Sequence, residues 1–168
     1  MIILGIDPGY AIVGYGVIEA IAGKYRPISY GAILTEAGEE FTRRLSVIYD
    51  DLNEIIRRYR PDAISIEKLF YHSNQKTVIG VAEARGVTLL AIEKNAVPFY
   101  EYTPLQVKTA VTGYGRADKK QVMEMTRRLL GLPELPKPDD AADALAMAIC
   151  HGQHLGAVYR QKLIGEGK

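Results

Sequence analysis

Four acidic residues stand where apolar segments end or where a helix is expected to begin. Asp7 follows the buried-strand pattern of residues 2–6, and Glu67 ends a second short apolar run. Asp140 and Asp143 are three positions apart in a helical pattern, so they are neighbours on one helix face. Carboxylate oxygens are the ligands that Mg²⁺ prefers. The chemistry that these residues could perform together is therefore metal-dependent hydrolysis.

Each acid also has a simpler structural explanation. Asp7 could be a solvated residue at the turn Pro8-Gly9. Aspartate is favoured at helix N-caps, where negative charge contributes a few tenths to about 1 kcal/mol, and we assign Asp139 to this cap. A cap does not explain Asp140 and Asp143 as well, because like charges at this spacing repel each other. The combination with Asp7 and Glu67 favours a metal site.

Length and composition indicate one domain with a buried core. The chain has 168 residues, 48% of them hydrophobic, and we expect a domain over 1–158 followed by a flexible polar tail over 159–168. Lys and Arg total 21 against 20 Asp and Glu, so any polyanion must be held by local clusters. No apolar run approaches the roughly 18 residues of a membrane span, and no signal-peptide pattern is present, so we expect a soluble cytoplasmic protein without a membrane partner. The single cysteine, Cys150, lies in an apolar run and is expected in the core.

The elements that must position these acids form an α/β pattern. Alternating and apolar runs predict strands over 2–6, 14–19, 28–34, 63–67 and 98–102, the first three joined as an antiparallel meander. Helical spacing predicts helices over 39–60, 77–93, 105–111 and 121–130, and a long one from Asp139. Gly86, inside the second of these, is interpreted as a point of close packing on the sheet.

An ordered set of short motifs extends from residue 2 to about residue 155. It comprises Gly5-Ile6-Asp7-Pro8-Gly9, Gly14-Tyr15-Gly16, Ile66-Glu67 followed by Phe70, Ala84-Arg85-Gly86, Gln106-Val107-Lys108 and Asp140-Ala141-Ala142-Asp143-Ala144-Leu145-Ala146. In this order the set resembles the RuvC family of bacterial Holliday junction resolvases, in the ribonuclease-H-like superfamily. The resemblance implies a mixed sheet flanked by helices. It also implies a homodimeric endonuclease of recombination and repair that cuts two symmetry-related strands of a four-way DNA junction, with the RuvA-RuvB branch-migration complex as partner.

The resemblance assigns the metal ligands by position. They fall on Asp7, Glu67, Asp140 and Asp143. Some relatives carry a histidine where Asp140 stands, so histidine participation is not supported at this position. The implied cofactor is Mg²⁺, two ions per active site, with Mn²⁺ as a substitute. We hypothesise that Asp7 bridges both ions, an arrangement that needs no side-chain nucleophile.

Candidate DNA-binding residues are basic or aromatic. The basic ones are Lys108 and, in an expected flexible loop over 112–120, Arg116, Lys119 and Lys120. An ordinary charged surface loop explains them equally well, but the resemblance places Lys108 and Lys119 near the scissile phosphate. It also favours Phe70 stacking on an unpaired base at the crossover, although a loop aromatic packed onto the sheet is the structural alternative.

Other functions share parts of this pattern. Actin-like ATPases begin with a similar glycine-aspartate hairpin, but they need a second phosphate loop. A resolvase-like nuclease acting on ribosomal RNA precursors shares the fold but is generally shorter. A junction-binding protein without catalysis is a further alternative, against which the intact set of four acids argues.

Overall fold

The computed structural model describes residues 1–68 and 78–165, with side chains up to residue 156. The described residues form a five-stranded sheet in the order β3-β2-β1-β4-β5. The strands are β1 (Ile2–Asp7), β2 (Ile12–Ile21), β3 (Lys24–Leu34), β4 (Ala63–Glu67) and β5 (Phe99–Tyr102). β1, β2 and β3 pair antiparallel, whereas β4 pairs parallel with β1 and with β5. The mixed sheet expected from the sequence is confirmed.

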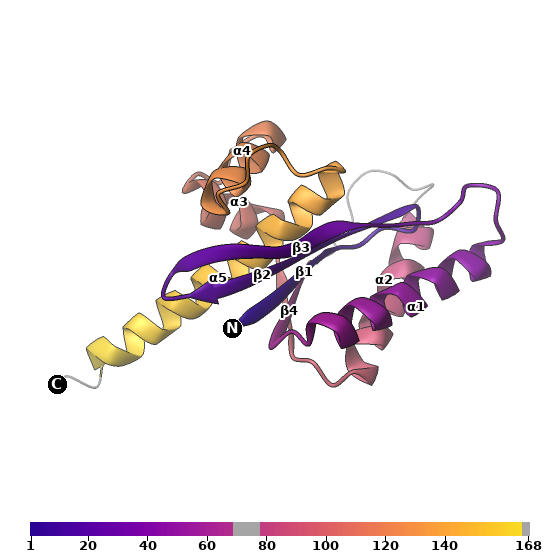
Figure 1. Ribbon diagram of the computed structural model, residues 1–168, viewed down its shortest axis with the longest axis horizontal. Helices are drawn as coiled ribbons and strands as arrows, with labels where there is room; N and C mark the ends of the chain where they lie inside the picture. The colour runs from indigo at the N-terminus through magenta and orange to yellow at the C-terminus, as the bar shows by residue number, and fades with distance from the viewer. Residues whose placement is uncertain (69–77, 166–168) are drawn as a thin grey trace.

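Helices cover both faces of this sheet. They are α1 (Phe41–Tyr59), α2 (Val78–Lys94), α3 (Pro104–Thr112), α4 (Lys119–Leu129) and α5 (Asp139–Gly165). α1 and α2 lie together on one face, and α5 runs along the other face with α3 and α4 near its N-terminal half (Figure 1). No helix in the described part of the chain is long and apolar enough to cross a membrane.

The alternation of side chains along β1 assigns its residues to the two cores. Leu4 and Ile6 are fully buried among apolar residues of α1 and α2, whereas Ile3 is buried in the core that α5 completes. Because successive side chains of a strand point to opposite faces, Gly5 and Asp7 lie on the same face as Ile3. Asp7 therefore ends β1 on the side that α5 covers.

Three glycines let α5 approach this face closely. A Cβ at Gly5 would overlap the backbone of Ala144, and one at Gly14 would overlap the carbonyl oxygen of Asp140. At Gly16 it would lie 2.7 Å from Cγ of Leu145. The glycines of β1 and β2 thus bring the first turns of α5 within reach of the end of β1.

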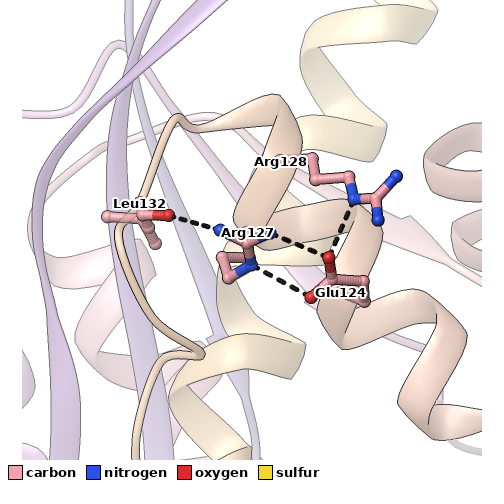
Figure 2. Close-up of polar contacts among 4 residues, drawn as sticks. All are labelled: Glu124, Arg127, Arg128 and Leu132. Atoms are coloured by element: carbon pink, nitrogen blue, oxygen red, sulfur yellow. Dashed lines mark hydrogen bonds and ion pairs between the residues drawn. The ribbon is translucent and has the colours of Figure 1, made fainter.

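A cluster of charged residues fixes the connection between α4 and α5. Glu124 accepts hydrogen bonds from Arg127 Nε at 3.0 Å and from Arg128 Nε at 2.8 Å, while Arg127 Nη1 donates to the carbonyl of Leu132 at 2.9 Å (Figure 2). The two arginines lower the pKa of Glu124 to about 2, so it stays ionised. The hydrogen bond from Arg127 to Leu132 therefore links the end of α4 to the segment that precedes α5.

Some details agree with the sequence-based expectations and others differ. The turn between β2 and β3, expected at Gly23-Lys24, falls at Ala22 and Gly23, both with positive φ, as the twist of a two-residue hairpin requires. Our interpretation of Gly86 is wrong, because a Cβ there would meet nothing within 4 Å. α5 continues to Gly165, past residue 158, and the division into a domain and a flexible tail stays a prediction. Cys150 is fully buried, as expected.

Candidate active site

Asp7 and Glu67 end two neighbouring parallel strands. Ile6 of β1 is paired with Ile66 of β4, so the acids that follow occupy adjacent positions at one edge of the sheet. Ser65 is paired with Gly5, which faces α5, and the alternation of β4 therefore directs Glu67 to the face of Asp7. Both acids were predicted from the sequence to meet at matching strand ends, and the register confirms that placement.

Asp140 and Asp143 enter the same region from the first turns of α5. The carbonyl of Asp140 rests against Gly14, which is paired directly with Asp7 across the β1–β2 ladder. The four predicted acids are close enough for their charges to act on one another, since Asp143, Glu67 and Asp140 all raise the pKa of Asp7. All four acids therefore lie near the end of β1, within electrostatic reach of Asp7.

The electrostatics of the acids favour binding of a cation. Burial, followed by repulsion from Asp143, Glu67 and Asp140, raises the pKa of Asp7 from 3.8 to about 8, with Lys119 opposing the shift. Burial and Asp143 likewise raise the pKa of Glu67. Burial raises the pKa of Asp143, although Lys119 acts in the opposite direction. A divalent ion would relieve both the repulsion and the cost of desolvating these carboxylates.

Among the described residues, Lys119 is the cation that forms ion pairs with the acids at the start of α5. Its Nζ lies 3.1 Å from Oδ2 of Asp143 and 3.5 Å from Oδ2 of Asp139. The expectation that Lys119 and Lys120 lie in a flexible loop is wrong, because both are in the first turn of α4, whose N-cap is Asp118. Asp118 accepts a hydrogen bond from the backbone N–H of Gln121 at 2.8 Å, and this capping box ends the loop one residue before Lys119.

A pocket of about 210 Å³ opens beside the acids. Charged residues at the pocket include Glu67, Asp143, Lys108 and Lys119, whereas its apolar lining comes from Pro104, Val107, Val122, Ala146 and Met147. α3 brings Lys108 to this pocket, and the start of α3 is fixed by a capping box between Thr103 and Gln106, with Pro104 in its first turn. The site therefore combines carboxylates with two lysines, as a reaction at a phosphate group requires.

The acids suit Mg²⁺ by their chemistry. Hard carboxylate oxygens at the end of β1 are desolvated and repel one another, which is the environment that a divalent ion neutralises. Among the described residues, no three acid, histidine or cysteine side chains already converge to enclose an ion. Mg²⁺ usually keeps several waters and takes only one or two protein carboxylates, so such a closed cluster is not needed.

Neither Arg116 nor Lys120 lines the pocket beside the acids. Arg116 is exposed in the loop before α4, and Lys120 lines a separate groove with Tyr114 and Arg128. Phe70 lies outside the described residues, so its stacking role stays a prediction.

Sequence reasoning missed the contact of Gly14 with α5. The glycines of the first hairpin and the alanines after Asp140 did indicate close packing between these segments. Which glycine contacts which turn of the helix, however, depends on how α5 packs on the sheet.

Comparisons with known proteins agree on one family. A family model described as crossover junction endodeoxyribonuclease RuvC matches residues 3–151. Crossover junction endodeoxyribonuclease RuvC of Desulforamulus reducens is 56% identical over 153 residues, which cover 91% of this chain and 94% of that protein.

Solved structures give the same result. The Thermus thermophilus RuvC structure superposes with a TM-score of 0.85 at 35% identity, covering 93% of this chain and 97% of that one. T. thermophilus RuvC in complex with Holliday junction substrate matches with the same TM-score, 0.85, at 38% identity, covering 90% and 92% of the two chains. These matches favour neither an actin-like ATPase nor a nuclease of ribosomal RNA precursors.

Proposed function

This chain belongs to the RuvC family of crossover junction endodeoxyribonucleases, and from that premise we propose that it resolves four-way DNA junctions by paired cleavage of symmetry-related strands. The observation that carries the proposal is the meeting of Asp7, Glu67 and Asp143 at the end of β1, with two lysines beside them. An acid site of this kind serves phosphodiester hydrolysis without a side-chain nucleophile.

The roles of the residues follow from their positions. The carboxylates of Asp7, Glu67, Asp140 and Asp143 would hold two Mg²⁺ ions, for which Mn²⁺ would substitute. When bound, the ions would activate a water and neutralise charge on the phosphate. Asp7 is more deeply buried than Glu67 or Asp143. Lys108 and Lys119, which line the same pocket as Glu67 and Asp143, would contact the phosphate.

A three-substrate assay tests this function. Purified protein is incubated with a synthetic four-way junction, a linear DNA duplex and a structured RNA, each with MgCl₂ or with EDTA. We expect symmetric nicks in the junction with Mg²⁺, and little cleavage of the other substrates. Preferred cleavage of the RNA, or junction binding without any cleavage in Mg²⁺, would contradict the proposal.

Paired cleavage requires two active sites, and we assign the dimer contact to α2. This helix carries apolar residues on its exposed side as well as on the side that packs on the protein: Ile79 is 68% exposed and Leu90 is 49% exposed, with Ala82 and Gly86 exposed between them. An exposed apolar stripe of this kind is typical of a protein–protein contact. The open space at Gly86 allows the same helix of a second copy to approach closely.

Leu90→Arg is therefore expected to shift the protein from dimer to monomer at micromolar concentration. A charge in the centre of an apolar contact is desolvated without a partner. Sedimentation velocity measures the change. The control is Leu34→Arg on the edge strand β3, because Leu34 is 67% exposed and its neighbour Ile33 is buried on the side of α1 and α2, so Leu34 points to the opposite face of the sheet. If Leu90→Arg sediments as the wild type does, α2 is not the interface.

Two further features belong to the proposal. The family's RuvA-RuvB branch-migration complex is the expected partner on the junction, and the cytoplasm, where chromosomal DNA recombines in a bacterium, is the expected location. Phe70 is expected to stack on a base at the crossover. Addition of RuvA-RuvB to the junction assay would test the partnership by a change in cleavage rate.

A further inference from the structure

Lys119 contacts the acids of α5, although it could extend into solvent from the first turn of α4. Its side chain is 55% exposed, yet Nζ is within ion-pair distance of both Asp143 and Asp139. The next residue, Lys120, lines a different groove, on the side of Tyr114 and Arg128. The two lysines therefore share a helix turn but differ in whether they contact the acids.

The contact with Asp143 concerns the oxygen that a metal ion would use. Lys119 Nζ is 3.1 Å from Oδ2 of Asp143, a distance at which the ammonium donates a hydrogen bond to that oxygen. A divalent cation coordinated by the same carboxylate would stand a few ångströms from the ammonium, and the two positive charges would repel each other. The ammonium of Lys119 and a divalent cation therefore cannot both interact with the Asp143 carboxylate at full strength.

We propose that Lys119 is the resident counter-ion of Asp143 and is displaced from this carboxylate when a divalent cation binds there. Displacement frees the ammonium to contact the DNA phosphate; this second step rests on the proposed nuclease function, whereas the first does not. The charge of Lys119 thus has opposite effects on the two ligands: it weakens binding of the divalent cation and strengthens binding of the DNA phosphate. The lysine is a positioning residue that couples metal binding to substrate binding.

The coupling predicts a result that a merely structural lysine would not give. Removing the charge of Lys119 should strengthen binding of Mg²⁺ to the DNA-free protein and weaken binding of junction DNA. Loss of one nearby positive charge is expected to lower the Kd for Mg²⁺ by about threefold to tenfold, because the charge is partly exposed and screened. The exposed position at the start of α4 makes the substitution compatible with folding.

The experiment is calorimetric titration of MgCl₂, and in parallel MnCl₂, into DNA-free full-length protein carrying Lys119→Gln, Lys119→Arg or Lys120→Gln. We expect tighter metal binding for Lys119→Gln only, since Lys119→Arg keeps the charge and Lys120→Gln removes an equal charge that does not contact the acids. Thermal unfolding of each variant confirms that it is folded. An unchanged or weaker affinity in Lys119→Gln, or an equal gain in either control variant, overturns the proposal. No DNA is present, so the result is independent of whether the protein cuts junctions.

Discussion

Replacing Asp7 with asparagine is expected to abolish junction cleavage while stabilising the metal-free protein at pH 8. Asp7 is the acid on which the other three act, and its carboxylate is desolvated as well as repelled by Asp143, Glu67 and Asp140. An asparagine keeps the shape without the charge. It cannot hold a divalent ion as a carboxylate does, so cleavage should fall by at least about a thousandfold, as for the removal of other essential electrostatic groups.

The stabilisation follows from the protons bound in each state. The pKa of Asp7 is about 8 in the folded protein and near 3.8 when the chain unfolds, so the folded state retains a proton that the unfolded state releases between these values. Stability contributed by this group is thus present below pH 4 and is lost as the pH rises toward 8. Asparagine does not ionise, so Asp7→Asn removes this pH-dependent loss of stability. We expect a gain in unfolding free energy of about 1–3 kcal/mol at pH 8, and a smaller gain at pH 5.

Urea unfolding in EDTA at pH 5 and pH 8 measures this difference. The control is Asp50→Asn on α1, whose side chain is exposed to solvent and should change stability by less than about 0.5 kcal/mol. If the Asp7→Asn variant is less stable than the wild type at pH 8, the ionised carboxylate of Asp7 stabilises the folded protein instead of destabilising it. Retained cleavage would remove it from the metal site.

The ends of the strands that carry Asp7 and Glu67 could be predicted from the sequence, because each depends only on the local pattern of apolar residues. The apolar runs before Asp7 and Glu67 have the length of buried strands, and their order along the chain left few ways to pair them. The helical spacing of Asp140 and Asp143 likewise needed no tertiary information. The three elements that carry the acids, β1, β4 and α5, were therefore predictable, whereas the sheet face on which the acids meet was not.

What could not be predicted depends on packing between distant segments. Gly86 and Gly14 look alike in sequence, yet only Gly14 contacts another element, and Gly86 lies open on the surface of α2. Lys119 was expected in a loop because the glycines before it suggested flexibility, but the cap at Asp118 starts α4 at Lys119, two residues before the predicted start of that helix. Its contact with Asp143 depends on how α4 docks against α5, which no local pattern encodes.

Gly14→Ala is expected to reduce cleavage by about a hundredfold or more, although residue 14 has no functional group. Gly14 is paired directly with Asp7, and a Cβ there would overlap the carbonyl oxygen of Asp140. Backbone cannot rotate aside as a side chain can, so the first turn of α5 must move away from the sheet. A displacement of about 1 Å at a catalytic group can cost a hundredfold in rate.

The same substitution should lower the unfolding free energy by about 1–3 kcal/mol, the usual cost of inserting an extra methyl group into a packed region. Gly38→Ala is the matched control, because a Cβ at Gly38 would meet nothing within 4 Å. Cleavage of a four-way junction and urea unfolding, measured on both variants, separate the effects. A loss of stability with full activity would mean that α5 adjusts without moving Asp140 and Asp143. A loss of activity far larger than the loss of stability is expected, since the overlap falls at the turn that carries both acids.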